Sequence, residues 1–372
     1  MVKFTLNGRF LVQNITGVQR VAREILAQLD HLAGIGQIPA PRLLAPAKGS
    51  IIARPDLKTI QIERVGRLTG HAWEQLELPL YAGRDPLLCL GNTAPVLPLL
   101  MPHHKVVTMV HDLSYKYFPS AYNWKFRAFY NALMPLVLRF SSHVATVSQA
   151  EQNAIETHYP FLEGSPRLSY LQNGGIPDHR VKELQNAEMP KAEDRGYGLY
   201  VGSLTKRKNA HGVLQGAVDF LRAYPGMRFV VIGATGASFD GPSFSIPGEI
   251  GNRIEFWGQI DDAERVYAAC AGARFMLFPS FYEASPLPPI EAMAFGCPVV
   301  ASRIPSLSER CGGAAVYCEA EDPKSISAAI GNLMEDPERW RQVSAAGRSW
   351  AARFSWEGQA RGLVSLCRKA AA

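Results

Sequence analysis

Short apolar runs alternate with longer helical patterns along most of the chain. In the first half, these runs predict strands at 2–7, 58–63, 86–91, 105–112, 143–148 and 167–174. In the second half, they predict strands at 198–203, 228–233, 253–258, 274–280, 298–302 and 314–318. Several runs are continuously apolar rather than alternating, which is typical of strands that are buried on both faces of a parallel sheet.

Helical patterns lie between these strands. In residues 17–30, apolar side chains such as Val18, Val21 and Ile25 fall on one helical face. Further helices are predicted at about 209–223, 261–272, 289–296 and 323–335, and in a helix-rich tract at 337–367. An interruption at 354–356 divides that tract, and Ser355 is the expected N-cap of its second helix.

A polar, charged stretch at 175–197 separates the two alternating halves and is interpreted as a linker. We therefore expect an α/β protein with two doubly wound, Rossmann-like domains, residues 1–176 and 177–355, that face a central cleft. In such domains ligands bind outside the carboxyl ends of the strands.

The composition narrows the class of protein. A chain of 372 residues with 47% hydrophobic and 19% charged residues is typical of a soluble globular protein with more than one domain. No apolar run is long enough to span a membrane, and the first residues lack the apolar core of a signal peptide. The six cysteines form no C-x-x-C pair, which indicates reduced, mostly buried thiols and a cytoplasmic location.

The net charge of +6 favours anionic partners such as nucleotide-linked substrates or acidic lipid surfaces. The basic residues are dispersed along the chain, so nucleic acid is not an expected partner. No histidine, aspartate or cysteine cluster has the spacing of metal ligands, and His103 and His104 are expected on a surface loop. We therefore expect neither a metal nor a cofactor.

Two glutamates flank the segment "EASPLPPIE" at 283–291. Glu283 is expected on the loop after a buried strand, and Glu291 in the first turn of a short helix that Pro289 begins and Gly296 ends. Backbone N–H groups between the glutamates suit an anion near the helix start. Alternatively, the glutamates only complement the helix dipole.

A basic turn, "YVGSLTKRKN" at 200–209, opens the second domain. It places Lys206, Arg207 and Lys208 between a strand and a helix capped by Asn209, an arrangement that suits phosphate. A solvated basic turn is the alternative.

Two features of the first domain lie at positions comparable to the basic turn of the second domain, at the start of a helix or the end of a strand. Gly17 begins a helix after Thr16, where a phosphate or sugar can approach the backbone closely, although helix capping alone also explains it. His111 ends a buried strand, so its side chain is expected to donate a hydrogen bond to a hydroxyl or phosphate. A structural histidine bonded to the backbone is the alternative.

These features occur in the order found in the retaining nucleotide-sugar glycosyltransferases of family 4, which have the GT-B fold, and the chain resembles that family. The segment "RIEFWGQIDDAERVYAACAGARFMLFPSFYEASPLPPIEAMAFGCPVVAS" is similar to the family's donor-binding block, including its E-x7-E spacing. The first domain adds "TGVQRVAREIL", "VHDLSYKYFP", "HVATVSQAEQNAI" and "YLQNGG". The segment "FSWEGQARGLV" resembles a C-terminal helix, at about 356–372, that crosses back onto the first domain.

The resemblance implies a hexosyltransferase that acts on a nucleotide sugar such as GDP-mannose or UDP-glucose. It implies that Arg207 and Lys208 neutralise the donor diphosphate and that Glu291 binds the ribose. Glu283 and the backbone of 285–287 (Ser285, Pro286 and Leu287) would hold the donor sugar. The nucleobase would lie at Gly258–Ile260, which includes Gln259 and Ile260. Gly17 would let a loop close over the phosphates, and His111 would face the sugar and the acceptor. With Lys208 and Glu283, His111 completes the expected catalytic set.

Two positions depart from the family pattern. The usual Glu-Gly-Phe-Gly appears here as Glu-Ala-Ser-Pro, so that Pro286 offers no N–H. Ser203 stands where an arginine often follows the glycine of the basic turn, and the diphosphate contact would then depend mainly on Arg207 and Lys208.

The implied reaction is a metal-independent transfer that retains the anomeric configuration, from the nucleotide sugar to a glycan or polyprenyl-diphosphate-linked acceptor. The implied setting is bacterial surface polysaccharide synthesis. A nucleotide-sugar epimerase and a non-catalytic nucleotide- or glycan-binding module are the alternatives.

Residues 115–140 are rich in aromatic and basic side chains. Packing of amphipathic helices in the core explains most of them. Six suit a peripheral contact with an anionic membrane at the inner face of the plasma membrane: Tyr115, Lys116, Tyr117, Trp124, Lys125 and Arg127.

Overall fold

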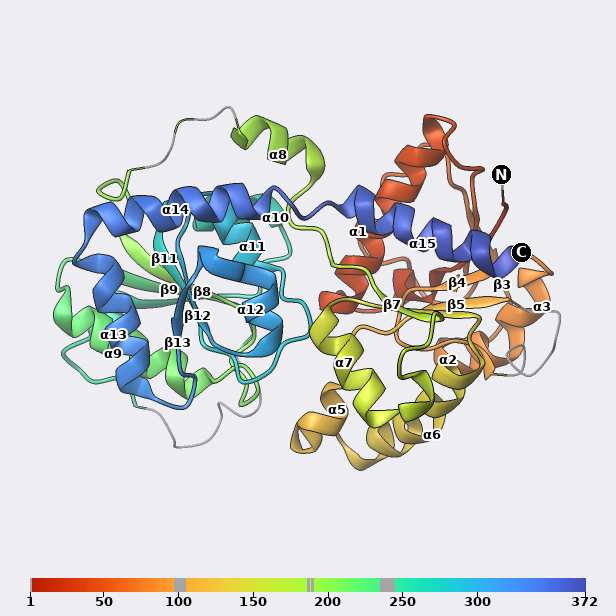
Figure 1. The fold of residues 1–372 in the computed structure, drawn as a ribbon, viewed down its shortest axis with the longest axis horizontal. Coiled ribbons are helices and arrows are strands. Elements are labelled where there is room, and N and C mark those ends of the chain that lie inside the picture. The colour runs from red at the N-terminus through yellow and green to blue at the C-terminus, as the bar shows by residue number, and fades with distance from the viewer. Residues whose placement is uncertain (1, 97–104, 186–187, 189–190, 235–244) are drawn as a thin grey trace. The chain divides into compact units, whose positions relative to one another are not determined.

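The chain forms two compact units, Met1–Gly174 with Trp356–Ala372, and Gly175–Ser355. They are described here from a computed structural model, which describes residues 2–96, 105–185, 188, 191–234 and 245–372 (Figure 1). His103 and His104 lie outside the described residues. Both units are α/β structures built on one parallel sheet.

The sheet of the first unit has the strand order β3-β2-β1-β4-β5-β6-β7. Its strands are β1 Thr5–Asn7, β2 Arg42–Pro46, β3 Ile62–Val65, β4 Leu87–Cys89, β5 Val106–Met109, β6 His143–Thr146 and β7 Leu168–Tyr170. Its helices are η1 Gly8–Val12, α1 Gly17–Gly34, α2 Gly70–Ala72, η2 Trp73–Glu77, α3 Leu78–Ala82, α5 Ser114–Tyr117, η3 Pro119–Ala121, α6 Trp124–Phe140, α7 Gln149–His158, η4 Pro160–Leu162 and α15 Trp356–Ala371. Helix α15 packs against α1, so the end of the chain belongs to the first unit.

The sheet of the second unit has the strand order β10-β9-β8-β11-β12-β13. Its strands are β8 Tyr197–Val201, β9 Arg228–Ile232, β10 Ile254–Gly258, β11 Ala273–Phe278, β12 Val299–Ser302 and β13 Val316–Cys318. Its helices are α8 Asp178–Gln185, α9 Ala210–Ala223, η6 Gly251–Arg253, α10 Ala263–Gly272, α11 Pro288–Ala294, α12 Pro305–Cys311, η7 Gly312–Ala314, α13 Pro323–Met334 and α14 Pro337–Ala351.

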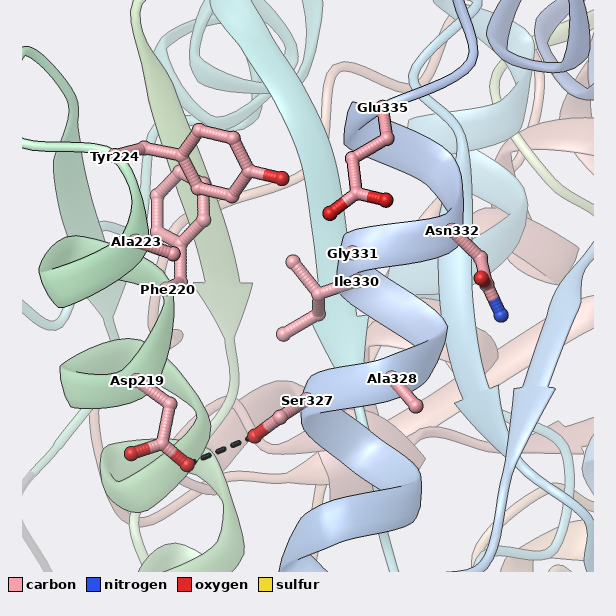
Figure 2. A pocket seen from close by; sticks show the side chains of 10 residues that line it. All are labelled: Asp219, Phe220, Ala223, Tyr224, Ser327, Ala328, Ile330, Gly331, Asn332 and Glu335. Atoms are coloured by element: carbon pink, nitrogen blue, oxygen red, sulfur yellow. Dashed lines mark hydrogen bonds between the residues drawn. The ribbon is translucent and has the colours of Figure 1, made fainter.

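Helices α9 and α13 lie side by side in the second unit (Figure 2). Ser327 on α13 donates a hydrogen bond of 2.8 Å to Asp219 on α9. A pocket of about 270 Å³ opens between the last turns of the two helices. Both helices begin beside the carboxyl ends of the strands. Their last turns, and with them this pocket, therefore lie toward the amino ends of the strands.

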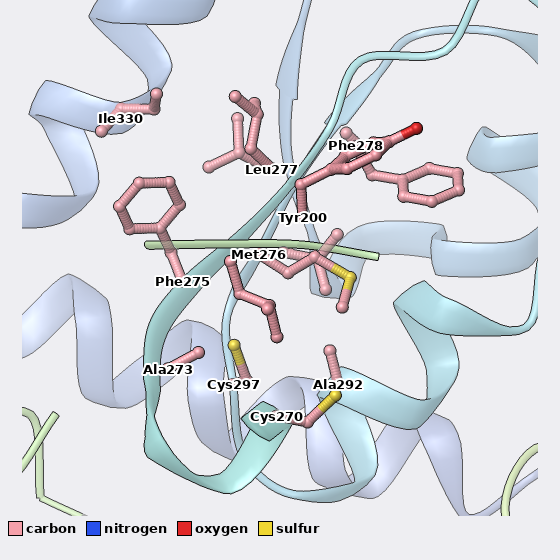
Figure 3. Packing of buried hydrophobic residues seen from close by; sticks show 14 of the residues in the cluster. Tyr200, Cys270, Ala273, Phe275, Met276, Leu277, Phe278, Ala292, Cys297 and Ile330 are labelled. Carbon is pink, nitrogen blue, oxygen red and sulfur yellow. The ribbon is translucent and has the colours of Figure 1, made fainter. Parts of the chain in front are cut away.

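Strand β11 is the centre of the second unit's core (Figure 3). Phe275, Met276, Leu277 and Phe278 are all fully buried. Alternate side chains serve the two faces of the sheet, and the ring of Phe275 meets that of Phe220 on α9 at a centroid distance of 4.9 Å. Because β11 is buried on both faces of the sheet, its sequence is a continuous apolar run.

The predicted strands and helices are found, with shifts at their ends, but strand β2 was not predicted. Its sequence, Arg42–Pro46, lies between prolines, which are uncommon in central strands and hid the apolar run. Pro46 is tolerated because it forms the last residue of the strand. The strand predicted at 58–63 lies instead at Ile62–Val65.

The interpretation of 175–197 as a linker was wrong in part. This stretch contains helix α8, and its last residue, Tyr197, begins β8. Among the described side chains of α8, those that pack against the core are Val181 and Leu184. The helix therefore shows too few apolar positions to be recognised by pattern.

Arg195 joins this stretch to the helices that follow. Its side chain donates hydrogen bonds to the carbonyl of Ala273, at 2.7 Å, and of Phe295, at 2.8 Å. These carbonyls follow the ends of α10 and α11, where backbone oxygens lack helical partners. A single buried guanidinium therefore fixes the ends of two helices.

We predict that Arg195→Ala lowers the free energy of unfolding by about 2–3 kcal/mol, because buried carbonyls lose a charged donor. Urea unfolding measures the change. The matched control is Arg303→Ala, since Arg303 is 62% exposed beside Glu319, and its expected effect is within about 0.5 kcal/mol. Equal effects of the two substitutions would contradict the prediction.

Candidate functional site

The loops after β8 and β11 leave neighbouring strands of the second unit. The chain passes from β8 outward through β9 and β10, and then returns to β11 on the other side of β8. This is the topological switch point, beside which ligands bind in doubly wound sheets. Residues 202–209 and 279–287 therefore converge at the carboxyl edge of the sheet.

Asn209 fixes the conformation of the basic turn and connects it to neighbouring strand ends. Its backbone is left-handed, with φ of 55°, and its side-chain oxygen accepts a hydrogen bond from Gly212 N–H at 3.0 Å. Its amide group donates to the carbonyls of Pro279, at 3.0 Å, and Ala320, at 2.7 Å. Asn209 therefore caps α9, as predicted, and also ties the turn to the ends of β11 and β13.

The carboxylate of Glu283 lies between two cations of this turn. It is 8% exposed, and it accepts hydrogen bonds from Lys208 Nζ at 2.8 Å, Ser280 Oγ at 3.0 Å and an Arg207 terminal nitrogen at 3.4 Å. Burial opposes ionisation, but the charges of Lys208 and Arg207 outweigh it and lower the pKa of Glu283. Glu283 is therefore ionised at neutral pH.

Arg207 and Lys208 are thus held by Glu283, although the sequence assigned the cations and the carboxylate to different parts of a ligand. Arg207 also donates to the carbonyl of Tyr282 at 2.9 Å, and its own carbonyl accepts from Phe281 N–H at 3.0 Å. The loops after β8 and β11 consequently form one connected unit. The two cations that contact Glu283, Arg207 and Lys208, exceed its single carboxylate by one positive charge, which favours an anion.

Glu291 is fully buried in the first turn of α11. The buried guanidinium of Arg310, on α12, donates to the carbonyl of Pro286 at 3.3 Å and lies 4.1 Å from the ring centre of Phe354. Burial lowers the pKa of Arg310 to about 9, while nearby negative groups, including Glu291, act in the opposite direction. Arg310 therefore stays charged and holds the segment between the two glutamates.

Arg310 was missed from the sequence because helix α12 was not predicted. The signal was present in "PSLSERC", where Ser306, Leu307, Arg310 and Cys311 fall on one buried helical face. An arginine on such a face needs buried acceptors.

The segment from Ser285 to Leu287 follows Glu283 as expected. Pro286 and Leu287 are buried, Ser285 is partly exposed, and Leu287 is the N-cap position of α11. Gly296 has φ of 66° just beyond the end of α11, which confirms the predicted cap. The carbonyl of Pro286 accepts a hydrogen bond from Arg310, and the nitrogen of Pro286 has no hydrogen to donate to a ligand.

Gln259 and Ile260 follow β10, at the edge of the sheet. Gln259 is exposed and donates to Asp261 at 2.8 Å. Gly233 connects this loop to the basic turn, because its N–H donates to Gly258 at 2.8 Å and a Cβ on it would lie 2.2 Å from the carbonyl oxygen of Gly202. Ser203, next to Gly202, accepts a hydrogen bond from Tyr200 at 3.1 Å through its carbonyl.

Gly17 and His111 belong to the first unit. Gly17 is the first residue of α1, and a Cβ added there would meet no atom within 4 Å. Packing therefore does not demand glycine at this position. His111 follows β5, is 5% exposed, and has Nε2 at 2.8 Å from the carbonyl of Leu90.

The contact with Leu90 limits what His111 can do. A carbonyl only accepts hydrogen bonds, so Nε2 carries the hydrogen. Burial lowers the pKa of His111, although the bond to Leu90 and the charge of Asp112 act in the opposite direction. The neutral ring then has no hydrogen on Nδ1, which can accept a hydrogen bond but not donate one. The expected donor role therefore becomes an acceptor role.

This burial predicts a pH dependence of stability. Below about pH 6.5 the unfolded chain takes up a proton that the native His111 refuses, so the free energy of unfolding falls as the pH falls toward the lower native pKa. Urea unfolding of the wild type and of His111→Gln at about pH 7.5 and about pH 5.5 measures this. We expect a smaller fall in the variant, and parallel falls would contradict the prediction.

The pocket between α9 and α13 contains none of the predicted site residues (Figure 2). Among the described residues, no group of three or more histidine, cysteine, aspartate or glutamate side chains could hold a metal ion. In the same residues, no helix has the length and apolar character needed to cross a membrane. All six cysteines are buried, which agrees with the predicted burial.

Comparison with solved structures identifies the fold. Sucrose-phosphate synthase from Thermosynechococcus elongatus superposes with a TM-score of 0.68 at 18% identity, covering 99% of each chain. The Anabaena protein Alr3699/HepE, solved with UDP and glucose, superposes with a TM-score of 0.62 at 16% identity, covering 100% of this chain and 98% of that one. These similarities, together with the two parallel sheets, show the α/β GT-B fold.

Sequence comparison identifies the family. Residues 181–350 match the family described as "Glycosyl transferases group 1". O-antigen chain mannosyltransferase B of Escherichia coli is 36% identical over 266 residues, which cover 69% of this chain and 69% of that protein. The chain therefore belongs to the group 1 glycosyl transferases, the nucleotide-sugar glycosyltransferases with the GT-B fold.

Proposed function

We propose that the protein transfers a hexose from GDP-mannose or a UDP-sugar to a hydroxyl of a glycan or lipid-linked acceptor, in bacterial surface polysaccharide synthesis. The contact of Lys208 and Arg207 with Glu283 at the switch point is the observation that carries this proposal. The similarity to an O-antigen mannosyltransferase supports the polysaccharide setting. The similarity to a protein solved with UDP and glucose supports a nucleotide-sugar donor.

In this proposal the donor diphosphate lies against Lys208 and Arg207, beside Ser203. The side chains of Lys208 and Arg207 are 15% and 24% exposed, so a ligand can reach both of them while Glu283 holds them. Glu283 and the backbone of Ser285–Leu287 hold the sugar, except that Pro286 gives no N–H. Glu291 receives the ribose hydroxyls, which requires that its fully buried carboxylate becomes accessible when the donor binds. The loop at Gln259 and Ile260 meets the nucleobase.

The proposed mechanism follows from the charges that develop on the donor during the transfer. Cleavage of the bond between sugar and phosphate creates negative charge on the diphosphate and an oxocarbenium-like sugar. Cations fixed before the reaction stabilise that charge, so we propose that no divalent metal is required. A β-phosphate oxygen takes the proton of the acceptor hydroxyl, which attacks from the same face, and the anomeric configuration is retained. His111 offers Nδ1 as an acceptor for a sugar hydroxyl, and Gly17 leaves room for the phosphates.

We predict that Lys208→Ala lowers kcat by on the order of 10²-fold or more, because a charge-stabilising group is lost. Turnover is measured with GDP-mannose and with UDP-glucose, in the presence of EDTA. The matched control is Lys206→Ala, which removes the same charge from an exposed position two residues away, and we expect near-normal turnover. Product NMR is expected to show a retained anomeric configuration.

Near-normal turnover of Lys208→Ala, or an equal loss in Lys206→Ala, would contradict the diphosphate assignment. Loss of wild-type activity in EDTA would contradict metal independence. Isomerisation of the donor without acceptor would favour the epimerase, and nucleotide binding without transfer to any acceptor would favour a binding module.

We also propose that helix α6 contacts the acidic inner face of the plasma membrane. The segment 113–150, which contains α6, has no acidic residue and includes Lys116, Lys125, Arg127 and Arg139. Four apolar side chains of α6 are exposed in spite of their size: Trp124 by 72%, Phe129 by 37%, Leu136 by 38% and Phe140 by 38%. This combination is typical of helices that lie in a membrane interface.

The structure changes the set of residues expected at this surface. Tyr115 is only 4% exposed and packs against Tyr130. Lys116 lies over the rings of Tyr115 and Tyr159, at 5.6 and 5.4 Å. The accessible residues of the expected set are Tyr117, Trp124, Lys125 and Arg127.

We predict that the wild type floats with liposomes rich in phosphatidylglycerol at low salt, and that the double variant Trp124→Ser/Lys125→Glu loses most of this binding. Each basic residue near such a surface contributes about 1 kcal/mol. The charge-reversal control is Arg339→Glu, at an exposed position on α14. Absence of flotation in the wild type, or equal binding by the double variant, would contradict this proposal.

A further inference from the structure

The first unit has its own topological switch point, between β1 and β4. These strands are neighbours in the sheet, although β2 and β3 come between them in the sequence. Ligands bind beside such points in doubly wound sheets. Arg9, which follows β1, pairs there with Glu74 at 3.1 Å, and the two side chains are only 7% and 1% exposed. Because this ion pair is buried, a ligand has to find its contacts on the neighbouring loops.

The loop after β5 is one of these neighbours, since β5 pairs with β4. Its backbone is fixed on both sides of Asp112. The N–H of His111 donates to Oδ1 of Asn92, which follows β4, at 2.5 Å. The N–H of Leu113 donates at 2.8 Å to the carboxylate of Glu151, which is 2% exposed. Asp112 is therefore held in place before any ligand arrives.

The carboxylate of Asp112 uses one of its two oxygens within the protein. Oδ1 accepts from the N–H of Ser114 at 3.0 Å and from its hydroxyl at 2.6 Å. No described residue donates to Oδ2 or forms an ion pair with Asp112. Asp112 is partly exposed, and Oδ2 is not one of the buried polar atoms that lack a partner. Oδ2 is therefore a hydrogen-bond acceptor that a ligand can reach.

A chain of hydroxyl groups orients this carboxylate. An ionised carboxylate only accepts hydrogen bonds, so Ser114 Oγ donates to Asp112 and accepts from the hydroxyl of Tyr122 at 2.5 Å. The ring of Tyr122 stacks on that of Phe126, with a centroid distance of 5.0 Å and an interplanar angle of 16°. These contacts fix the plane of the carboxylate and hence the direction in which Oδ2 points.

Capping of helix α5 does not by itself call for an aspartate at position 112. Asparagine serves as well as aspartate at the start of a helix, and α5 has only four residues. An asparagine would keep Oδ1 for Ser114 and would lack only the second acceptor oxygen. The feature that capping leaves unexplained is therefore the accessible Oδ2.

The chemistry of the loop selects the class of ligand. Besides Asp112, the preceding His111 offers Nδ1 as an acceptor, because its Nε2 donates to Leu90. Acceptors suit a partner that brings hydrogens, as a sugar does with its hydroxyls. The negative charge of Asp112 repels a diphosphate, so this loop favours a neutral sugar over the phosphate part of a nucleotide sugar.

We propose that Asp112 binds the acceptor, with one hydroxyl of a neutral acceptor sugar donating to Oδ2. Ser114 and Tyr122 act as positioning residues that orient the carboxylate. This inference rests on the proposed transferase function and names a residue of the acceptor site.

Asp112→Asn tests the proposal, because it keeps the cap but replaces Oδ2 with an NH₂ group that donates. Binding of methyl glycosides of mannose, glucose, galactose and N-acetylglucosamine to the full chain is measured by NMR titration. We expect at least one to bind the wild type, with an affinity that falls about tenfold or more in the variant, since a hydrogen bond to a charged group is lost. No binding to the wild type, or equal binding by the variant, would overturn the proposal.

Two further variants control for structural effects. Asp322→Asn makes the same change at a cap of the second unit, where Asp322 accepts from the N–H of Lys324 at 2.9 Å, and we expect unchanged affinity. Ser114→Ala removes a bond to Oδ1 but leaves Oδ2 in place, so we expect a smaller loss of affinity than in Asp112→Asn. Equal losses in Asp112→Asn and Asp322→Asn would contradict a direct contact.

Monodeoxy analogues of the bound glycoside identify the contact. One analogue lacks the hydroxyl that donates to Oδ2, and we expect the wild type and Asp112→Asn to bind it with equal affinity. Every other analogue is expected to bind the wild type more tightly. A structural effect of the substitution would instead weaken the binding of all analogues alike, and that result would overturn the proposal.

The same samples separate this inference from the proposed function. Binding of GDP-mannose and UDP-glucose, followed by thermal shift, is expected to be equal in the wild type and Asp112→Asn. A weaker shift in the variant would assign Asp112 to the donor and overturn the acceptor contact. Transfer by the variant with an unchanged KM for the acceptor would overturn only the role of Asp112. Glycoside binding that depends on Asp112, without any transfer by the wild type, would support the site and contradict the transferase function.

Discussion

The burial of one ionised carboxylate, that of Glu283, organises the second unit. A buried carboxylate is costly unless charged donors surround it, so its position is possible only where Lys208 and Arg207 arrive. Asn209 brings them there by fixing the basic turn to the ends of β11 and β13. Arg310 then secures the following segment through Pro286. The contacts depend on one another, since removing Glu283 would take the shared carboxylate from Lys208 and Arg207, and removing Lys208 would leave Glu283 only the longer contact with Arg207 among its cations.

Much of this could be predicted from the sequence, because the relevant signals are local. The apolar runs predicted most strands, and the spacing of Glu283 and Glu291 across a proline-rich loop predicted their elements. The pairing of Lys208 with Glu283 joins residues 75 positions apart, and only the order of strands in the sheet reveals it. Arg310 was hidden by a short unpredicted helix, and β2 by its prolines. The donor role expected for His111 was wrong because no pattern indicates that Leu90 takes its hydrogen.

The two units share one arrangement of charges. In each, a cation that follows the first strand of the sheet meets a buried carboxylate beside the topological switch point: Lys208 with Glu283, and Arg9 with Glu74. The carboxylates come from different places, since Glu283 follows β11 whereas Glu74 lies in a helical turn before β4. The similarity therefore reflects the physics of this edge of a parallel sheet, where strand ends, loop cations and buried oxygens meet.

The contact of Gly233 with Gly202 constrains how such a protein can diversify. Backbone lies directly on backbone there, and a Cβ at Gly233 would approach the carbonyl oxygen of Gly202 to 2.2 Å. Any larger residue at 233 would separate the ends of β8 and β9 and displace the basic turn. The exposed Gln259 has no such neighbour requirement. Along this edge, a substitution at Gln259 therefore disturbs the packing less than one at Gly233, and an altered ligand preference at that position would evolve at a smaller cost to the basic turn.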